Sequence, residues 1–161
     1  KLTYVRIVQY RGKSRMKLNS SQFQAYLAGF LDGDGSIYVR AKPNTSYRYG
    51  YQIAPYVAFF QSASSEAFPD MVAKIGYGRL RLRKDGIYEY TISKQAEIID
   101  FITKVSPYLI LKQEQAKLIV EILNLKSEIS DEIGFVKLLD KIDSFRELNY
   151  SKKRKKRTMI P

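Results

Sequence analysis

The chain has 161 residues, of which 45% are hydrophobic, with no cysteine, no histidine and a net charge of +12. This length suits one sizeable domain with a packed core, whereas the missing residue types exclude Cys/His zinc sites and any catalysis by histidine or cysteine. The basic surplus favours a polyanionic partner, nucleic acid first and an anionic membrane surface second.

The first predicted elements are a helix and two strands. Asn19-Ser20-Ser21 is typical of a helix N-cap, and the helix over residues 22–34 ends at Gly35. Alternation of apolar and polar residues from Ile37 to Lys42 predicts a strand. A second strand is expected over residues 48–60, where Pro55 indicates an edge position or a bulge.

A second helix, over residues 66–75, precedes another strand pair. Residues 79–83 alternate arginine with leucine, Lys84-Asp85-Gly86 is a hairpin signal, and the fourth strand covers 87–92. Helices over 95–105, 111–125 and 131–148, the last capped by Ser130, complete an α/β fold of the α+β type with antiparallel hairpins. We expect one domain over 21–148, between a basic extension (1–20) and a basic tail (149–161).

Both strand pairs combine an apolar face with a polar, mostly basic face. A twisted antiparallel sheet of this kind can lie in the major groove of DNA, where arginine pairs with guanine and glutamine with adenine. Half-buried strands of any antiparallel sheet alternate in the same way, so the pattern alone does not imply cleavage. The predicted DNA contacts are Tyr38, Arg40, Lys42, Asn44, Tyr47, Arg48, Gln52, Arg79, Arg81, Arg83, Glu89 and Thr91.

The end of the first helix reads LAGFLDGDG over residues 27–35. Gly29 and Gly33 each cost a helix roughly 1 kcal/mol relative to alanine, which indicates close approach of a second helix. Asp34 stands at the helix C-terminus, where the macrodipole disfavours a carboxylate by about 0.3–1 kcal/mol and a bound cation would remove that penalty. A calcium loop is an alternative for this string, but its further spaced carboxylates are missing.

These nine residues resemble the signature of the LAGLIDADG homing endonucleases, with Phe30, Leu31 and Gly33 in place of its Leu, Ile and Ala. The element order resembles the family's α-β-β-α-β-β-α core, whose twisted antiparallel sheet forms a DNA-binding saddle. The chain has one copy of the motif, and single-motif members act as homodimers. The resemblance implies a homing endonuclease that cuts both strands of a long, pseudo-palindromic DNA site.

The resemblance also implies roles for individual residues. Asp34 of each subunit would bind metal with the carbonyl of Gly33, Gln61 would orient metal-bound water, and Lys112 would lie near the scissile phosphate. The implied cofactor is Mg²⁺, with Mn²⁺ able to substitute and Ca²⁺ supporting binding without cleavage, as expected for oxygen ligands. Family members often carry a basic residue just past the position of Gln61, where this chain has only serines and an alanine (62–65). The implied dimer interface comprises Leu27, Ala28, Gly29, Leu31 and Asp32, the last of which more readily supports the helix end than binds metal.

The implied partners are double-stranded DNA and a second copy of the chain. No stretch approaches the ~20 apolar residues of a membrane span, so no membrane partner is expected. We expect an intracellular location, in the cytoplasm of a prokaryote or in an organelle. Two other functions fit the same fold: an intron RNA maturase, which would bind RNA, and a sequence-specific DNA-binding protein that does not cut. Metal-dependent cleavage separates both from the endonuclease.

Overall fold

The computed structural model describes residues 18–149, which form two compact units. Among these residues, the first unit combines residues 18–36 with Tyr56–Leu111, and the second combines Ile37–Pro55 with residues 112–149. Each unit therefore contains part of the strands and part of the helices. The predicted basic extension (1–20), except for its last three residues, and the basic tail (149–161), except for its first, lie outside the described residues.

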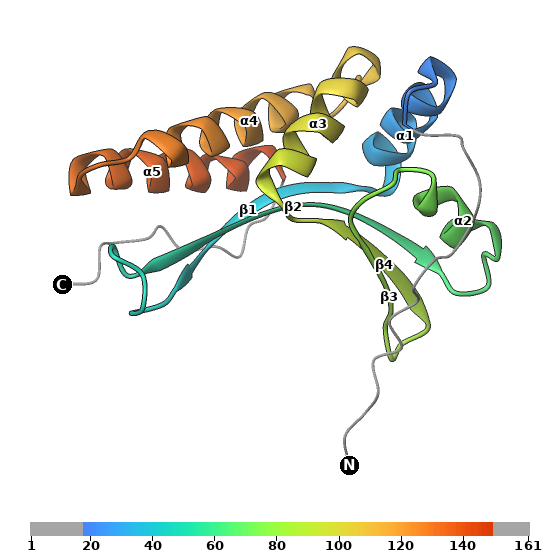
Figure 1. Cartoon of the computed structure of the whole chain (residues 1–161), viewed down its shortest axis with the longest axis horizontal. Helices are drawn as coiled ribbons and strands as arrows, with labels where there is room; N and C mark the ends of the chain where they lie inside the picture. Colours follow the sequence, from blue (N-terminus) through green and yellow to red (C-terminus); the bar gives the residue numbers. More distant parts are fainter. Residues whose placement is uncertain (1–17, 150–161) are drawn as a thin grey trace. The chain divides into compact units, whose positions relative to one another are not determined.

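The element order confirms the predicted α-β-β-α-β-β-α core followed by further helices (Figure 1). The elements are α1 (Ser21–Asp34), β1 (Ser36–Pro43), β2 (Tyr51–Ser62), α2 (Ala67–Ala73), β3 (Arg79–Leu82), β4 (Ile87–Ile92), α3 (Gln95–Val105), the 3₁₀ helix η1 (Ser106–Tyr108), α4 (Gln113–Glu128) and α5 (Glu132–Leu148). Within residues 18–149, no helix is long and apolar enough to cross a membrane.

The strands are hydrogen-bonded in the order β1-β2-β4-β3. β2 pairs antiparallel with β4 from Val57↔Ile92 to Ser62↔Ile87, and β3 pairs antiparallel with β4 from Arg79↔Thr91 to Leu82↔Tyr88. β2 is thus an inner strand of the sheet, but its pairing with β4 starts only at Val57, so that Pro55 itself has an open side, as an edge position requires. Pro55 is tolerated because it lies beyond the last residue of β2 that pairs with β4.

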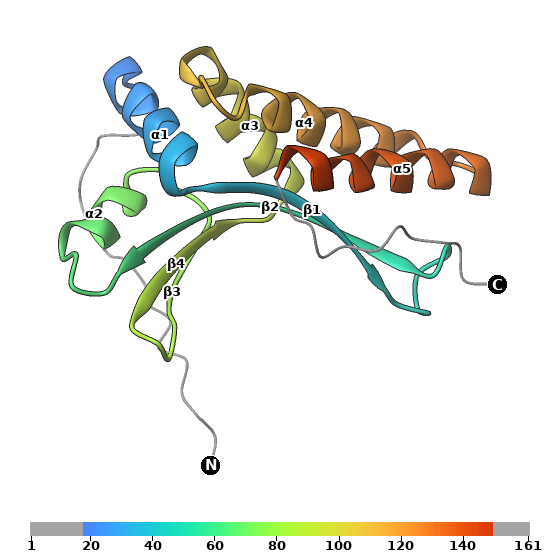
Figure 2. The same cartoon turned by 180° about the vertical axis from the view of Figure 1, so that it is seen from behind.

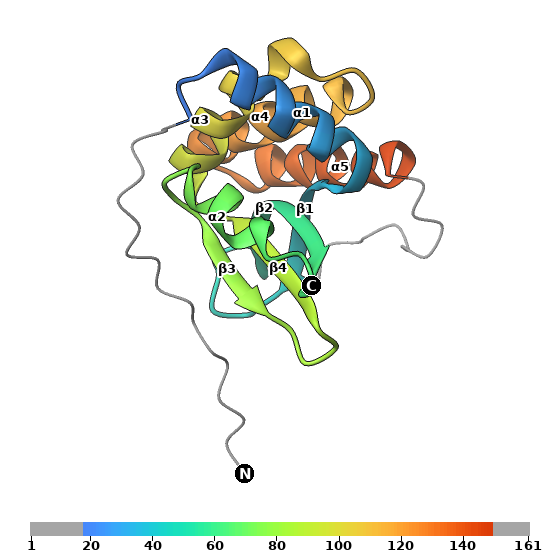
Figure 3. The same ribbon diagram turned by 90° about the vertical axis from the view of Figure 1, so that its right-hand side faces the viewer.

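The core of the first unit is built around Phe59 on β2. Its ring lies 5.3 Å from that of Phe30 on α1 and 5.9 Å from that of Phe101 on α3, the latter edge-to-face. Phe59 and Phe101 are fully buried, and α1 and α3 lie on the same face of this part of the sheet (Figure 2). The hairpin of β3 and β4 extends away from α1 and α3 (Figure 3).

The core of the second unit is built by α4 and α5, which lie side by side (Figure 1). The helical spacing of the apolar residues on α5 predicts its buried stripe, and Phe135, Leu138, Leu139, Ile142 and Phe145 are all buried. The helix begins at Glu132, one residue later than predicted. Asp131, not Ser130, is the N-cap, because its carboxylate accepts a 2.7 Å hydrogen bond from the Gly134 N–H.

Candidate active site and nucleic-acid interface

Asp34 is the last residue of α1, and β1 begins two residues later. The turn depends on Gly35, whose N–H donates to the Leu31 carbonyl at 3.1 Å. A Cβ atom on Gly35 would lie 2.5 Å from Cδ1 and 2.8 Å from Cα of Leu31. The lack of space for a side chain therefore requires glycine here. Its backbone conformation does not, because Gly35 is extended (φ −87°) and not left-handed.

The Asp34 side chain is exposed, and no basic residue stands in the last turn of α1. The carboxylate therefore meets the negative end of the helix dipole without a compensating cation on its own helix. Residues 18–149 contain no group of three or more His, Cys, Asp or Glu residues that could hold a metal. The predicted metal ligands, the Asp34 carboxylate and the Gly33 carbonyl, are both hard oxygen donors, and the remaining ligands would have to come from outside the chain.

Asp32, two residues earlier, has a different environment. Its Oδ2 atom accepts hydrogen bonds from the N–H groups of Ile110 (2.7 Å) and Leu111 (3.1 Å), which follow η1 in the same unit. One carboxylate of the motif therefore accepts hydrogen bonds from a loop of its own unit, whereas that of Asp34 is exposed. Asp32 is thus bonded to the loop after η1, and the expectation that it supports the helix end stays a prediction.

The two remaining predicted catalytic residues belong to different units. Gln61 is half-buried near the end of β2, opposite Tyr88, and its Oε1 accepts a 2.8 Å hydrogen bond from the Ser62 N–H. This leaves the Nε2 group of Gln61 as its donor end. Lys112 is the half-buried N-cap residue of α4 in the second unit.

The hairpin of β3 and β4 carries five of the predicted DNA contacts. Arg79 and Arg81 are exposed, and Arg81 faces Glu89 across the strands with an ion pair of 2.7 Å. Arg83 follows the strand and pairs with Asp85 at 2.6 Å. Thr91 is half-buried opposite Arg79. DNA would therefore compete with these acidic partners for two of the three arginines.

The second unit carries the other predicted contacts, on β1, on β2 and in the loop between them. Arg40, Lys42, Tyr47 and Arg48 are exposed, and Asn44 and Gln52 are half-buried. The loop is ordered by its own hydrogen bonds, from Tyr47 N–H to the Asn44 carbonyl (3.1 Å) and from Gly50 N–H to the Tyr47 carbonyl (2.9 Å).

Tyr38 corrects the predicted DNA-contact set. Its side chain is 4% exposed, and its ring lies 5.9 Å from that of Phe145 on α5. The alternation of β1 predicts that Tyr38 shares the solvent face of Arg40. A large aromatic ring can instead gain contact with the neighbouring helix, and Tyr38 is a packing residue.

The expected dimer interface also needs correction. Leu27, Ala28 and Leu31 are 0% exposed, so their side chains have no surface to offer a second chain. The exposed stripe of α1 carries Tyr26 and Gly29, with Phe30 half-buried and Gly33 exposed beyond them. These positions are spaced i, i+3, i+4 and i+7, which is one face of a helix.

One polar network of the first unit is not indicated by any motif in the sequence. The Tyr77 hydroxyl donates to Oδ2 of Asp100 (2.8 Å), which also pairs with Lys104 (2.8 Å), and the Tyr90 hydroxyl donates to the Tyr77 carbonyl. The pKa of Tyr77 is raised, mainly by burial and then by its hydrogen bond to the Asp100 carboxylate. Burial alone would also raise the pKa of Asp100. The hydrogen bonds from Lys104 and Tyr77 outweigh burial and hold the pKa of Asp100 below its usual value.

This network fixes the start of the β3–β4 hairpin to α3. Gly78 has φ +83°, and a Cβ there would lie 2.5 Å from the Tyr90 hydroxyl oxygen, so the Gly-Tyr-Gly segment (76–78) is the one signal that could have indicated it. The network holds the arginine-bearing hairpin to the helical part of its unit.

Comparison with known proteins gives a consistent set of relatives. The LAGLIDADG endonuclease family model matches residues 27–112. The chain is 36% identical over 138 residues to the DNA endonuclease I-CreI of Chlamydomonas reinhardtii, covering 84% of each protein, and 35% identical over 100 residues to the DNA endonuclease I-CvuI of Chlorella vulgaris, covering 62% of each. The crystal structure of the homing endonuclease I-CvuI with its target in the presence of Ca matches with a TM-score of 0.74 at 29% identity, over 87% of this chain and 88% of that one.

Proposed function

Because the chain belongs to the LAGLIDADG endonuclease family, we propose that it is a site-specific homing endonuclease that cuts double-stranded DNA. The relatives that support this are DNA endonucleases by name, and one is a homing endonuclease seen bound to its DNA target. The intron maturase and the non-cleaving DNA-binding protein are less favoured, because these relatives are nucleases.

The observation that carries the catalytic proposal is the contrast between Asp32 and Asp34. Asp32 accepts two backbone hydrogen bonds within its unit, whereas Asp34 is exposed at the negative end of α1. We assign Asp34 and the Gly33 carbonyl as the metal ligands of each chain, with Mg²⁺ as the working ion, Mn²⁺ as its substitute and Ca²⁺ as a binding-only ion. A divalent ion there would lower the pKa of its bound water and stabilise the charge that develops on the leaving oxygen.

The chain's own side chains would orient the DNA around that site. The Nε2 group of Gln61 can donate to the attacking water or to a phosphate oxygen. Lys112 would place a cation near the scissile phosphate. The exposed arginines of β1, β3 and the β1–β2 loop would contact phosphates and base edges. The affinity for DNA should therefore fall as the salt concentration rises, while the base contacts determine where along the DNA the protein binds.

A homodimer is the proposed assembly. Cβ atoms built on Gly29 and Gly33 meet no atom within 4 Å, so the single chain gives no packing reason for either glycine. Tyr26 is 56% exposed beside them, and the loop fastened by Asp32 exposes Ile110 (80%) and Leu111 (72%). A second copy of α1 could approach closely over the two glycines, and an isologous pair of this kind calls for a near-palindromic target.

The proposal is tested by selecting cut sites from a plasmid library of randomised and intron-insertion-like sequences, with Mg²⁺ and with EDTA. Recovery of one pseudo-palindromic site, cut on both strands only with Mg²⁺, is the expected result. Retention of a specific duplex site without any cut would indicate the DNA-binding protein, and preference for structured intron RNA would indicate the maturase.

A further inference from the structure

Two arginines that we assign to DNA binding rest on tyrosine rings in the second unit. The guanidinium carbon of Arg40 lies 5.8 Å from the centre of the Tyr38 ring, and that of Arg48 lies 5.2 Å from the centre of the Tyr49 ring. Both distances are within the range of a cation–π contact. Each arginine is exposed, yet one side of its cationic group is held by an aromatic ring.

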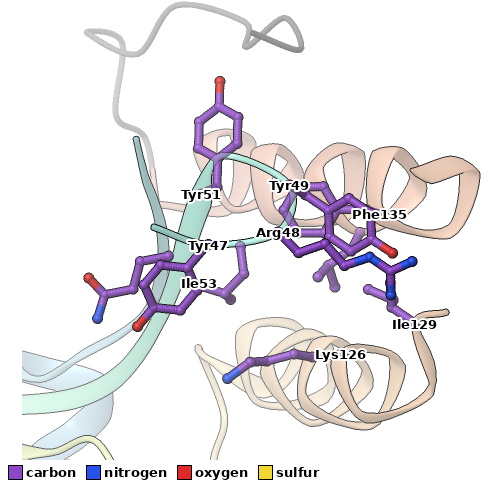
Figure 4. Close-up of a pocket in the computed structure, with 10 residues that line it drawn as sticks. Tyr47, Arg48, Tyr49, Tyr51, Ile53, Lys126, Ile129 and Phe135 are labelled. Atoms are coloured by element: carbon purple, nitrogen blue, oxygen red, sulfur yellow. The ribbon is translucent and has the colours of Figure 1, made fainter. Parts of the chain in front are cut away.

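Each of these tyrosines rests in turn on a phenylalanine of α5. The rings of Tyr49 and Phe135 are stacked, 4.7 Å apart at 20°, with Arg48 beside them (Figure 4). The rings of Tyr38 and Phe145 are 5.9 Å apart at 50°. Phe135 and Phe145 are 4% and 0% exposed. They are ten residues apart, so the two stacks meet α5 about 15 Å from each other.

The helix that carries both phenylalanines is itself held to β1 and α4. The Asn149 side chain, just after α5, donates to the Ile37 carbonyl at 3.2 Å, and the buried Gln115 side chain of α4 donates to the Leu148 carbonyl at 3.2 Å. Because α5 is held in place by these bonds, the tyrosine rings that stack on its phenylalanines are held in place as well.

The space around the β1–β2 loop makes the Tyr49 contact important. A cavity of about 380 Å³ is lined by Tyr47 and Arg48 from the loop and by Lys126 and Ile129 from the helical side (Figure 4). Part of the loop therefore borders open space instead of packed side chains. The Tyr49–Phe135 stack is the aromatic contact that joins the loop to α5 beside this cavity.

We infer that α5 positions Arg40 and Arg48 for base recognition through two separate stacks, Arg40–Tyr38–Phe145 and Arg48–Tyr49–Phe135. This inference rests on the proposed DNA-binding function. The tyrosines and phenylalanines are positioning residues that need not touch DNA. An arginine whose guanidinium group is restrained before binding can form its two hydrogen bonds to guanine at only one base-pair position. Each stack should therefore determine how strongly the protein discriminates between bases at the pairs that its own arginine contacts.

The test measures binding discrimination at every base pair of the selected site, in Ca²⁺. Arg40→Ala and Arg48→Ala first identify the base pairs that each arginine reads, with an expected loss of roughly 5- to 150-fold at those pairs. Tyr49→Leu should then reduce discrimination about two- to fivefold at the Arg48 pairs and leave the Arg40 pairs unchanged. Tyr38→Leu should show the reverse pattern. Tyr49→Phe and Tyr38→Phe keep the rings and should retain the wild-type profile.

A second measurement needs no DNA. NMR relaxation of the Arg48 Nε–H group should show an ordered side chain in the free protein that becomes mobile in Tyr49→Leu but not in Tyr49→Phe. Equal mobility in all three proteins would overturn the inference even if the protein binds or cuts DNA. A uniform loss of discrimination across the whole site in Tyr49→Leu would also overturn it, because that pattern indicates general unfolding. Absence of specific DNA binding by the wild type, with an ordered Arg48, would count against the proposed function instead.

Discussion

Replacing Asp32 with alanine should destabilise the first unit, whereas the same change at Asp34 should not. Asp32 accepts two backbone hydrogen bonds, at 2.7 Å and 3.1 Å, from the loop after η1. Hydrogen bonds to charged groups contribute about 1.5–3 kcal/mol each when well protected. Both of these are exposed, and Asp32 also lies in the unfavourable last turn of the helix dipole, so we expect a net loss of about 1–2 kcal/mol.

For a chain of this size, that loss corresponds to a fall in Tm of about 2–8 °C. Thermal and urea unfolding followed by circular dichroism give the global value, and amide hydrogen exchange at Ile110 and Leu111 gives the local one. Asp32→Asn retains a neutral acceptor and should recover part of the loss. Asp34→Ala is the matched control and should leave stability unchanged or raise it by about 0.3–1 kcal/mol. Equal stabilities for Asp32→Ala and Asp34→Ala, with unchanged exchange at the two amides, would refute the assignment of Asp32 as a loop fastener.

Three further predictions concern the dimer, the hairpin network and the phosphate contact. Gly29→Leu should fold at least as stably as the wild type as a single chain, because its Cβ meets open space, but sedimentation should show a monomer; a dimer of normal affinity would argue against the α1 interface. Tyr77→Phe removes a hydrogen bond that lowers the pKa of Asp100 in the folded protein. A lowered folded-state pKa stabilises the fold above the unfolded-state pKa, and this stabilisation is lost as the pH falls through the folded-state pKa. The difference in unfolding free energy between wild type and variant should therefore be full near neutrality and shrink in acid, and a difference that does not change with pH would contradict this. Lys112→Ala should lower the cleavage rate more than DNA affinity, which single-turnover kinetics and titration separate; a pure loss of affinity would make Lys112 an ordinary phosphate contact.

Much of this fold could be predicted from the sequence because local signals agreed with tertiary packing. The α3 bounds follow from helical spacing, and the hairpin from the Lys84-Asp85-Gly86 turn. The wrong predictions share a physical cause: each concerns a side chain that could lie either at the surface or in the core. Tyr38 alternates with the polar face of β1 yet packs on Phe145, and Leu27 and Leu31 belong to the motif helix yet fill the core of their own chain.

The candidate site was predictable only to the level of residue identity. The dipole argument marked Asp34 as unusual and the family resemblance implied its role, but the hydrogen bonds of Asp32 come from a loop nearly eighty residues away in the chain. The Tyr77–Asp100 network and the stacks on α5 join residues 23 and 86 or more positions apart, and no periodicity in the sequence indicates such pairs.

We propose that Asp34 holds the metal with which this chain cuts DNA. The most direct measurement compares the wild type with Asp34→Asn on a plasmid that carries the selected site, scoring linear product in Mg²⁺ and complex formation in Ca²⁺. We expect linear plasmid from the wild type only with Mg²⁺, and none from Asp34→Asn, which should still fold and bind the site. Cleavage by Asp34→Asn at the wild-type rate, or Mg²⁺-independent cleavage by the wild type, would contradict this proposal.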